Sequence, residues 1–418
     1  MISAAPSRTQ LLLPLLETLV ERGGSVRADV AIDALSDRLK IPSDVRNDYR
    51  TVEFANWGPR KRCAWRQSVH WVRQDAVTRG LIAKNERGVW TVTDRGEDAL
   101  KNCRPGVILV VYETPNGEAI WADAVTAAGA LEANSVNLLF SSPPYPIVSG
   151  RGYGKFSESE VIELIINCAT DWHRALKDDG SMVLNFKDVW LPKAQTGGVV
   201  RSLYQEKLLI ALAEDAKFFF ADRMFWQNPS HSPESPFVTI QRVRCNQDVE
   251  NLLWLSKTPN PKANNRNVAA EAKQSTIDTY RRRHNRGVGK TLTGPSGQNN
   301  CFEEQQIAVA NGETLKVIPR NLIVASNADT HTAQKRRLAE AGLSRHDAAM
   351  PIALADHMIK FLTDKGDTVY DPFHGSGTTG LAAERLERRW IGSDRSLSHL
   401  VGSSFRFGQE PLFDPATV

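Results

Sequence analysis

The chain has 418 residues, of which 41% are hydrophobic and 24% charged, and its formal net charge is +4. This length allows two or three domains with a large core, and the composition excludes a disordered or fibrous protein. So mild an excess of positive charge does not by itself indicate a nucleic-acid-binding protein.

The cysteine pattern and the apolar runs indicate in which compartment the protein works and whether it spans a membrane. Five cysteines are scattered along the chain without a Cys-x-x-Cys pair (Cys63, Cys103, Cys168, Cys245 and Cys301). An odd, dispersed set argues against a disulfide framework and a zinc cage, so we expect no metal site and a cytoplasmic protein. The run Leu11–Leu16 is too short to span a membrane and lacks a small-residue cleavage site, so we expect no membrane segment.

Residues 1–104 are predicted to form a separate small domain. Helical spacing of apolar residues covers 12–20, 30–39 and 65–82. In the segment 84–96 (KNERGVWTVTDRG), side chains after a polar turn then alternate between two faces, with Val89, Thr91 and Thr93 on one and Trp90 and Val92 on the other, as in a short hairpin. Three helices followed by a two-stranded wing predict a winged-helix domain, and the stretch resembles the one at the N-terminus of Mrr-type restriction proteins.

Basic residues gather on the third predicted helix and the turn before it: Arg60, Lys61, Arg62, Arg66, Arg73 and Arg79. Such side chains can meet DNA phosphates while the helix lies in a major groove. The alternative is solvated surface charge on a domain used for protein contacts. We favour DNA binding, with Arg66 and Arg73 as candidate contacts.

The segment Leu138–Pro146 (LLFSSPPYP) starts as a buried strand and ends in two serines, two prolines and a tyrosine. Prolines so close together cannot continue a central strand. They fix a rigid, extended bend whose backbone carbonyls have no amide partner. The strand is therefore predicted to end in a cluster of hydrogen-bond acceptors beside an aromatic ring.

Residues 367–396 (DTVYDPFHGSGTTGLAAERLERRWIGSDRS) follow the order strand, glycine-rich turn, helix, strand. Gly375 and Gly377 let the backbone approach a ligand, and the helix N-terminus offers unpaired amides. Asp394, at the end of the second strand, is a plausible ribose binder. Alone, this pattern also suits a nicotinamide enzyme or a structural turn.

Taken together, SSPPY and DPFHGSGTTG resemble the amino-group DNA methyltransferases that use S-adenosylmethionine, in the order of that family's permuted β class. The resemblance runs from about Ala119 to Leu400. It implies an α/β, Rossmann-like, circularly permuted methyltransferase fold over residues 105–418. The chain would enter this sheet near the third strand and close it with the first two, and the target-recognition region would lie at about 260–345.

The resemblance also implies residue roles. The catalytic set is Ser142, Pro143, Pro144 and Tyr145, in which the serine hydroxyl and the first proline carbonyl accept hydrogen bonds from the target amine. The tyrosine would stack on a base extruded from the duplex. S-adenosylmethionine would be bound by Asp371, Phe373, Gly375, Gly377, Thr378, Thr379 and Asp394, and by Asp123 beside its adenine. The alternatives are a non-functional loop, a capping role for Asp394 and an ordinary surface acid at Asp123.

A basic segment lies within the predicted target-recognition region. Between Lys257 and Lys290 there are nine basic residues and two acidic ones. Such a segment suits an arm that closes on phosphates and reaches bases, with Arg281, Arg282 and Arg283 as candidate contacts. The alternative is a solvated, disordered loop.

The cysteines and Ser142 indicate which atom of the base is methylated. None of the five cysteines follows a proline, which argues against methylation of a cytosine ring carbon. In the family, serine at the position of Ser142 usually accompanies cytosine-N4 methylation, and Asp or Asn accompanies adenine-N6. The sequence therefore predicts a site-specific DNA methyltransferase acting on the 4-amino group of cytosine in double-stranded DNA.

Alternatives to this function stay open on the sequence alone. One is adenine-N6 methylation by the same site, and another is a DNA-binding regulator whose methyltransferase fold is inactive. An oxidoreductase fits only if the chain binds a nicotinamide cofactor. The sequence also leaves open whether the chain forms a homodimer and whether a cognate restriction endonuclease accompanies it.

Overall fold

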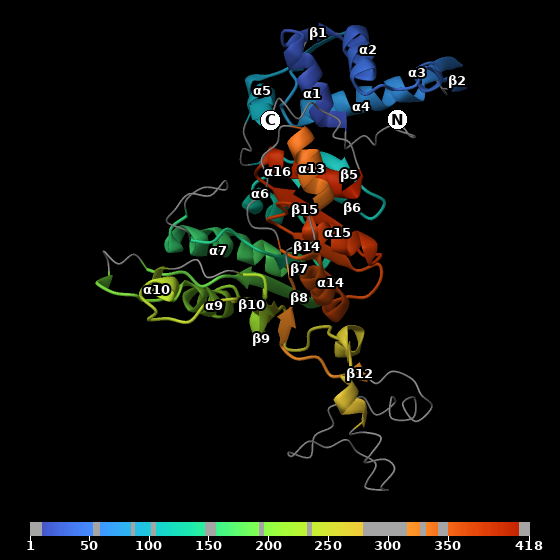
Figure 1. The fold of residues 1–418 in the computed structure, drawn as a ribbon. Coiled ribbons are helices and arrows are strands. Elements are labelled where there is room, and N and C mark those ends of the chain that lie inside the picture. The colour runs from blue at the N-terminus through green and yellow to red at the C-terminus, as the bar shows by residue number, and fades with distance from the viewer. Residues whose placement is uncertain are drawn as a thin grey trace.

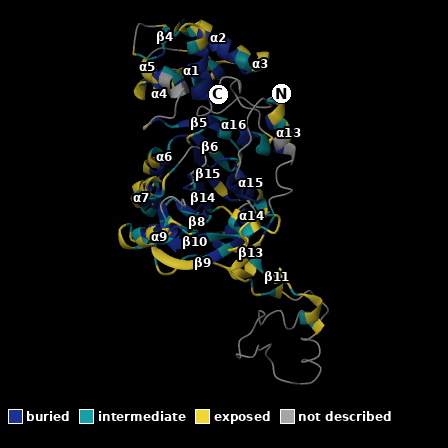
Figure 2. Ribbon diagram, turned by 60° about the vertical axis from the view of Figure 1, so that its left-hand side comes forward, coloured by how far each residue is buried: buried dark blue, intermediate teal, exposed yellow. Residues whose placement is uncertain are grey.

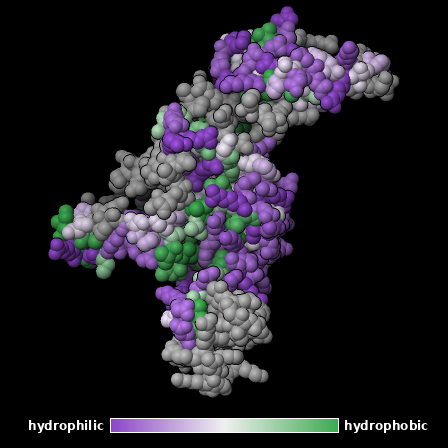
Figure 3. Space-filling model, turned by 45° about the vertical axis from the view of Figure 1, so that its right-hand side comes forward, coloured by the Kyte–Doolittle hydropathy of each residue, from purple (hydrophilic) through white to green (hydrophobic). Residues whose placement is uncertain are grey.

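The computed structural model describes residues 11–52, 59–84, 88–101, 106–146, 156–191, 196–231, 236–278, 316–326, 332–341 and 350–408. A small, mainly helical N-terminal domain lies against one edge of a larger α/β domain (Figure 1). Hydrophilic side chains dominate the visible surface of the small domain, while hydrophobic patches appear over the larger one (Figure 3).

The N-terminal domain has the predicted winged-helix arrangement. Its elements are α1 (Leu12–Glu21), β1 (Ser25–Arg27), α2 (Ala28–Arg38), α3 (Ser43–Arg46), β2 (Tyr49–Val52), β3 (Arg60–Cys63), α4 (Ala64–Thr78), β4 (Val89–Thr91) and α5 (Asp94–Lys101). In the wing, β4 pairs antiparallel with β1, and Ile82 forms a bridge with Val92. The three predicted helices correspond to α1, α2 and α4.

The structure corrects the placement of the basic residues before the third helix. Arg60, Lys61 and Arg62 lie on β3, which pairs antiparallel with β2, and not in a turn. Polar side chains follow one another along this short strand, so no apolar alternation marks it in the sequence.

The larger domain is built on one mixed sheet. Its elements are β5 (Leu109–Glu113), β6 (Gly117–Trp121), α6 (Ala124–Ala130), β7 (Val136–Ser141), α7 (Glu158–Ala175), β8 (Leu176–Phe186), α9 (Tyr204–Glu214), β9 (Phe219–Gln227), α10 (Pro236–Thr239), β10 (Val249–Ser256), η2 (Asn265–Val268), β11 (Ala270–Glu271), β12 (Lys316–Val317), β13 (Leu322–Val324), α13 (Thr332–Glu340), α14 (Ile352–Leu362), β14 (Thr368–Asp371), α15 (Thr378–Arg385), β15 (Arg389–Asp394), α16 (Leu397–Ser404) and η3 (Phe405–Phe407).

The strand order confirms the predicted permutation. The nine-stranded sheet runs β13-β9-β10-β8-β7-β14-β15-β6-β5. Five central strands, from β8 to β6, are parallel, whereas β10 is antiparallel to both of its neighbours. The last two strands that the structure describes, β14 and β15, lie between β7 and β6. The chain therefore enters the sheet at one side and completes its centre last.

Helices cover both faces of the sheet, which explains why β7 is buried along its whole length (Figure 2). One apolar core joins Leu139 of β7 to α6, α7 and α9. The other joins Leu138 and Phe140 to α14, α15 and α16, and continues into the N-terminal domain through β5 and α1. Strands of a parallel sheet buried on both sides are expected to be largely apolar, as β7 is apart from Asn137 and Ser141.

The predicted target-recognition region is described only in part. In residues 260–278, 316–326 and 332–341, β11 pairs with β12 and β13 extends the main sheet beside β9. Helix α13 packs near α16 through a hydrogen bond from Gln334 Nε2 to the Gly402 carbonyl (2.8 Å). Arg281, Arg282 and Arg283 lie outside the described residues, so their DNA contacts remain a prediction.

Within the described ranges, no helix combines the length and the apolar character needed to cross a lipid bilayer.

Candidate active site

The SSPPY segment begins where β7 ends, at the carboxyl edge of the parallel strands. Ser141 is the last residue of β7, and its hydroxyl donates a 2.5 Å hydrogen bond to Asp371 Oδ1 at the end of β14. The chain then leaves the sheet, because Pro143 and Pro144 have no amide hydrogen to donate. Ligand sites in open α/β sheets form at this edge, so both predicted motifs meet where a ligand is expected.

A hydrogen-bonded network surrounds the Ser142 hydroxyl. Ser142 Oγ lies 3.0 Å from the Tyr145 hydroxyl, which in turn donates to Glu250 Oε2 at 3.1 Å. Asn185 Nδ2 donates to both the Tyr145 hydroxyl (2.9 Å) and Glu250 Oε2 (2.8 Å). Four polar side chains from three neighbouring strands, β7, β8 and β10, thus converge on one point of the sheet edge.

Tyr145 contributes its hydroxyl to this network as well as its ring. The ring packs near Phe186, with centroids 6.4 Å apart. Burial is the main cause that raises the pKa of Tyr145 well above its usual value, and the neighbouring Glu250 raises it further. The tyrosine therefore stays protonated and acts as a hydrogen-bond donor, while its stacking on an extruded base remains a prediction.

Asn185 and Glu250 were missed by the sequence reasoning. Asn185 is almost fully buried on β8, and its Oδ1 makes no hydrogen bond to any residue that the structure describes. Burial raises the pKa of Glu250, partly offset by the hydrogen bond from Asn185 and the charge of Lys187. The available signal was a single carboxylate entering the apolar strand VENLLWLS, a residue type that is rarely buried without a partner.

The glycine-rich turn follows β14 and leads into α15. Gly375 and Gly377 have positive φ values of 49° and 78°, a conformation that favours glycine. A Cβ at Gly377 would also lie 2.9 Å from the Ser403 side chain. The helix begins at Thr378, so its first amides, including those of Thr378 and Thr379, point along the turn.

Asp394 ties this turn to the end of β15. Its Oδ2 accepts from the Gly375 amide and its Oδ1 from the Ser396 amide, both at 2.8 Å. Burial would raise the pKa of Asp394, but the hydrogen bond and charge of His399 and the two amides outweigh it and lower the pKa. Asp394 is therefore an ionised, buried carboxylate, as a ribose-binding role and the alternative capping role both require.

Asp371 is a second buried carboxylate at this edge. Its Oδ1 accepts from Ser141 and from the amide of Phe373 (3.1 Å). Burial is the main cause that raises its pKa to about 6, and no ion pair with a described residue offsets it. A buried carboxylate without a positive partner is the type of group that a cationic ligand stabilises.

We expect Asp371→Asn to be more stable than the wild type above pH 6, by roughly 3 kcal/mol at pH 8. The folded wild type binds a proton with a pKa of about 6, above the ordinary value, so its stability rises as the pH falls from 6 towards 4. The asparagine keeps an oxygen for Ser141 and Phe373. Urea unfolding at pH 8 and pH 5 measures the difference, and an equal difference at both pH values would contradict the raised pKa.

His374 lies in the glycine-rich turn, and its buried side chain packs against neighbouring residues of the core. Its ring stacks on Trp390 (centroids 5.4 Å apart, 5° between planes), and its Nε2 lies 3.1 Å from the Tyr112 hydroxyl. A Cβ added at Gly392 on β15 would overlap the imidazole ring. The absence of a side chain at Gly392 therefore makes room for the histidine that positions the turn.

We expect Gly392→Ala to lower the free energy of unfolding by about 1–3 kcal/mol, because the fixed imidazole cannot move aside. The displaced turn should also bind its ligand more weakly. Gly198→Ala is the matched control, since a Cβ there has no heavy atom within 4 Å. Thermal unfolding of both variants tests this, and equal melting temperatures would refute the packing role of Gly392.

Asp123 follows β6 at the same edge of the sheet. Its Oδ1 accepts from the Thr126 amide (2.9 Å) and its Oδ2 from the Thr126 hydroxyl (2.5 Å), so it caps α6. The neighbouring Ala122 amide bonds to the Asp394 carbonyl (3.2 Å), which places Asp123 beside the turn region. Its contact with a cofactor adenine remains a prediction, while its capping role is a finding.

The predicted DNA contacts of the winged helix already have partners within the domain. Arg66 pairs with Asp33 of α2 (2.5 Å), and Arg73 donates to the Ala83 carbonyl (3.5 Å). Arg79, at the end of α4, bonds to the Ile108 carbonyl (2.9 Å) and so joins the two domains. Phosphate binding by Arg66 and Arg73 remains a prediction, and it would compete with these contacts.

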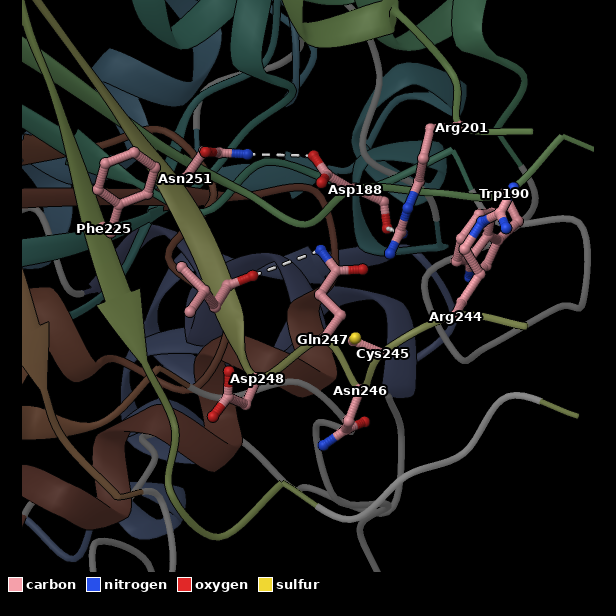
Figure 4. A pocket seen from close by; sticks show the side chains of 11 residues that line it. Asp188, Trp190, Arg201, Phe225, Arg244, Cys245, Asn246, Gln247, Asp248 and Asn251 are labelled. Carbon is pink, nitrogen blue, oxygen red and sulfur yellow. Dashed lines mark hydrogen bonds between the residues drawn. The ribbon is translucent and has the colours of Figure 1, made fainter. Parts of the chain in front are cut away.

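A pocket of about 470 Å³ opens at the ends of β8, β9 and β10 (Figure 4). The Arg201 guanidinium lies 3.6 Å from the centre of the Trp190 ring. Asn251 donates to Asp188 Oδ1 at 3.1 Å. Val249 and Asn251 line the pocket and flank Glu250 in the chain, so the pocket and the network share strand β10.

Comparisons with known proteins agree with this geometry. The family model described as DNA methylase matches residues 136–401, which include both motifs, and the model of the Mrr N-terminal domain matches residues 9–102. The type II methyltransferase M.PvuII of Proteus hauseri is 30% identical over 300 residues, which are 71% of this chain and 85% of the relative. The type II methyltransferase M.BglI of Bacillus subtilis is 46% identical over 55 residues, 13% of this chain and 16% of its own.

A solved structure named PvuII DNA methyltransferase (cytosine-N4-specific) is also similar. It aligns with 75% of this chain and 93% of its own, with 25% identity and a TM-score of 0.55. Both resemblances drawn from the sequence, to the amino-group methyltransferases and to the Mrr N-terminal domain, are thereby confirmed. The motifs, the permuted sheet and the matched residues lead to one conclusion: the chain belongs to the DNA methylase family.

Proposed function

We propose that this protein transfers a methyl group from S-adenosylmethionine to the 4-amino group of cytosine in double-stranded DNA. The observation that carries the proposal is the position of Ser142. Its hydroxyl lies at the end of β7, next to the residue that bonds Asp371 of the glycine-rich segment. An acceptor for an amine and a binding turn for a cofactor thus meet at one sheet edge.

The residues of the turn fit S-adenosylmethionine, which combines a cationic amino acid, a ribose and an adenine but carries no phosphate. Asp371 offers a buried carboxylate without a positive partner among the described side chains. Asp394 offers an ionised acceptor for ribose hydroxyls, and the amides at the start of α15 offer donors. The buried side chain of Thr379 acts on the Asp371 carboxylate by a hydrogen bond that lowers its pKa, so the turn and this carboxylate form one site.

Catalysis follows from what the chain does to the target amine. When bound, S-adenosylmethionine supplies a methyl group on a positively charged sulfur. The amine of cytosine is a poor nucleophile because its lone pair is delocalised into the ring. Acceptors at Ser142 Oγ and at the Pro143 carbonyl hold its two protons, which directs the nitrogen lone pair towards the methyl group. Fixed dipoles and alignment of this kind supply the rate enhancement.

Cytosine is favoured over adenine by two independent points. Serine stands where the adenine-specific members usually have Asp or Asn, and the similar solved structure is named cytosine-N4-specific. An inactive regulator is disfavoured because the acceptor and both turn glycines have the expected geometry. Adenine-N6 methylation stays as the second candidate for the same network.

The DNA surface would also include the pocket at the ends of β8, β9 and β10. Its wall of Trp190 and Arg201 can stack on a base or neutralise a phosphate, and Asp188 with Asn251 can read base edges. The winged-helix domain would add affinity through its own DNA contact. We place the protein in the bacterial or archaeal cytosol at the nucleoid, and we include a cognate restriction endonuclease and a second copy of the chain among the partners to be sought.

The proposal is tested by transfer of a radiolabelled methyl group to duplex DNA of varied sequence. We expect label in duplexes that contain cytosine–guanine pairs and none in poly(dA)·poly(dT). Label in poly(dA)·poly(dT) would instead assign adenine to this site. A protein that binds S-adenosylmethionine but labels no duplex would favour the inactive regulator.

A further inference from the structure

Glu250 holds one end of the network, where it contacts Tyr145 and Asn185 but not Ser142. It enters from β10, the antiparallel neighbour of β8, and a single oxygen, Oε2, accepts from both Tyr145 and Asn185. The site as proposed requires Ser142 as an acceptor and Tyr145 as a ring for the base. It gives no role to a carboxylate at this position, so the carboxylate needs its own explanation.

The charge of Glu250 fixes which way the hydroxyl protons point. Tyr145 has one hydroxyl proton, and it is donated to the carboxylate. The Tyr145 oxygen can then only accept, so the Ser142 hydroxyl, 3.0 Å away, must donate its proton to Tyr145. Asn185 Nδ2 reinforces this direction, because its shorter contacts are to Glu250 (2.8 Å) and Tyr145 (2.9 Å), while its contact with Ser142 Oγ is longer at 3.5 Å. The lone pairs of Ser142 Oγ are thereby left to accept from the target amine.

We propose that Glu250 is a positioning residue that makes Ser142 an acceptor and takes up the proton released by methyl transfer, an inference that rests on the proposed function. Transfer forms an N–CH₃ bond, breaks the sulfur–methyl bond and leaves a positive charge on the amine nitrogen. That nitrogen gives a proton to Ser142 Oγ as Ser142 passes its own to the Tyr145 oxygen. Tyr145 then passes its proton to Glu250 Oε2, which ends as a neutral carboxylic acid beside a neutral methylated base.

The surroundings of Glu250 suit a carboxylate that is charged at rest and can be neutralised. Burial is the main cause that raises its pKa, and the hydrogen bonds from Asn185 and Tyr145 lower it. Lys187, which follows β8, and His231, which follows β9, also lower it and lie 3.5 Å from each other. Both hydrogen bonds to Oε2 come from donors, as a carboxylate that accepts at rest requires, and burial gives it a higher affinity for a proton than an exposed glutamate has.

The test compares Glu250→Gln with Tyr145→Phe, with both changes together and with Glu214→Gln, an exposed glutamate at the end of α9 as matched control. Single-turnover methyl transfer to cytosine DNA and S-adenosylmethionine affinity are measured from pH 5 to 9. We expect Glu250→Gln to lose about 100-fold in rate with cofactor affinity within twofold of the wild type. The double variant should transfer methyl groups no more slowly than the slower of the two single variants, because each substitution interrupts the same hydrogen-bond relay.

The pH profile separates this role from a merely structural one. With S-adenosylmethionine saturating, so that protonation of Asp371 does not limit the rate, the wild-type rate should fall at acid pH as Glu250 is protonated, and the rate of Glu250→Gln should lack that acid limb. A Glu250→Gln enzyme that keeps its rate, or loses rate while keeping the acid limb, would overturn the inference alone. A wild type that forms no methylcytosine would overturn the proposed function itself, and the inference with it.

Discussion

Ser142→Ala is expected to lower the rate of methyl transfer by about 100-fold or more and to leave S-adenosylmethionine affinity within twofold of the wild type. The hydroxyl is part of a network with Tyr145 and Asn185, not with the glycine-rich turn. Its loss removes an acceptor from the target amine without touching the residues that fit the cofactor. Single-turnover kinetics and calorimetric titration of the cofactor measure the two effects separately.

Ser141→Ala is the informative control, because it changes the adjacent serine. Ser141 Oγ donates to Asp371 Oδ1. This variant should therefore change the affinity for S-adenosylmethionine more than it changes the rate of methyl transfer at saturating cofactor. Comparison of the two variants would then separate the effect on methyl transfer from the effect on cofactor binding. If Ser142→Ala instead lost cofactor binding, or methylated DNA at the normal rate, its assignment as the acceptor would be wrong.

Asp394→Ala is expected to weaken S-adenosylmethionine binding by about 100-fold and to lower the free energy of unfolding by roughly 1–3 kcal/mol. Both effects have one cause. The carboxylate accepts from the amides of Gly375 and Ser396, and without it these buried donors lose their partner while the turn loses its anchor. Calorimetric titration and urea unfolding of the same preparation measure affinity and stability together.

Asp364→Ala provides the comparison for Asp394. Asp364 precedes β14 at the opposite end of the strand, is 68% exposed and pairs with Lys262. A surface ion pair of this kind contributes little, so both affinity and stability should stay near the wild-type values. An Asp394→Ala variant with unchanged cofactor affinity would reduce Asp394 to the capping role that the sequence left as its alternative.

The fold, the catalytic segment and the glycine-rich turn could be predicted because each is marked by a pattern of neighbouring residues. Prolines after an apolar strand mark Ser142, and glycines before a helix mark the turn at Gly375 and Gly377. Their order also predicts the permutation, which the central position of β14 and β15 confirms. Each of these features depends on residues within one short segment.

The carboxylate in an apolar strand marked Glu250 as unusual, but the roles of Asn185 and Glu250 could not be predicted, because they depend on strands that are distant in the sequence. Only the pairing of β10 with β8 brings Glu250 to Asn185 and Tyr145. The same limit applies to Arg66: its predicted phosphate contact stays a prediction, but the ion pair with Asp33 of α2 could not be read from the local sequence. Local patterns show which residue types are present, whereas the long-range pairing decides what each one contacts.

The most direct test of this account is mass spectrometry of the nucleosides from duplex DNA methylated by the purified protein, with Ser142→Ala in parallel. The account predicts N4-methylcytosine from the wild type and none from the variant. N6-methyladenine as the wild-type product would keep the network but contradict the assignment of cytosine. The absence of any methylated base, from a protein that binds S-adenosylmethionine, would contradict the central claim.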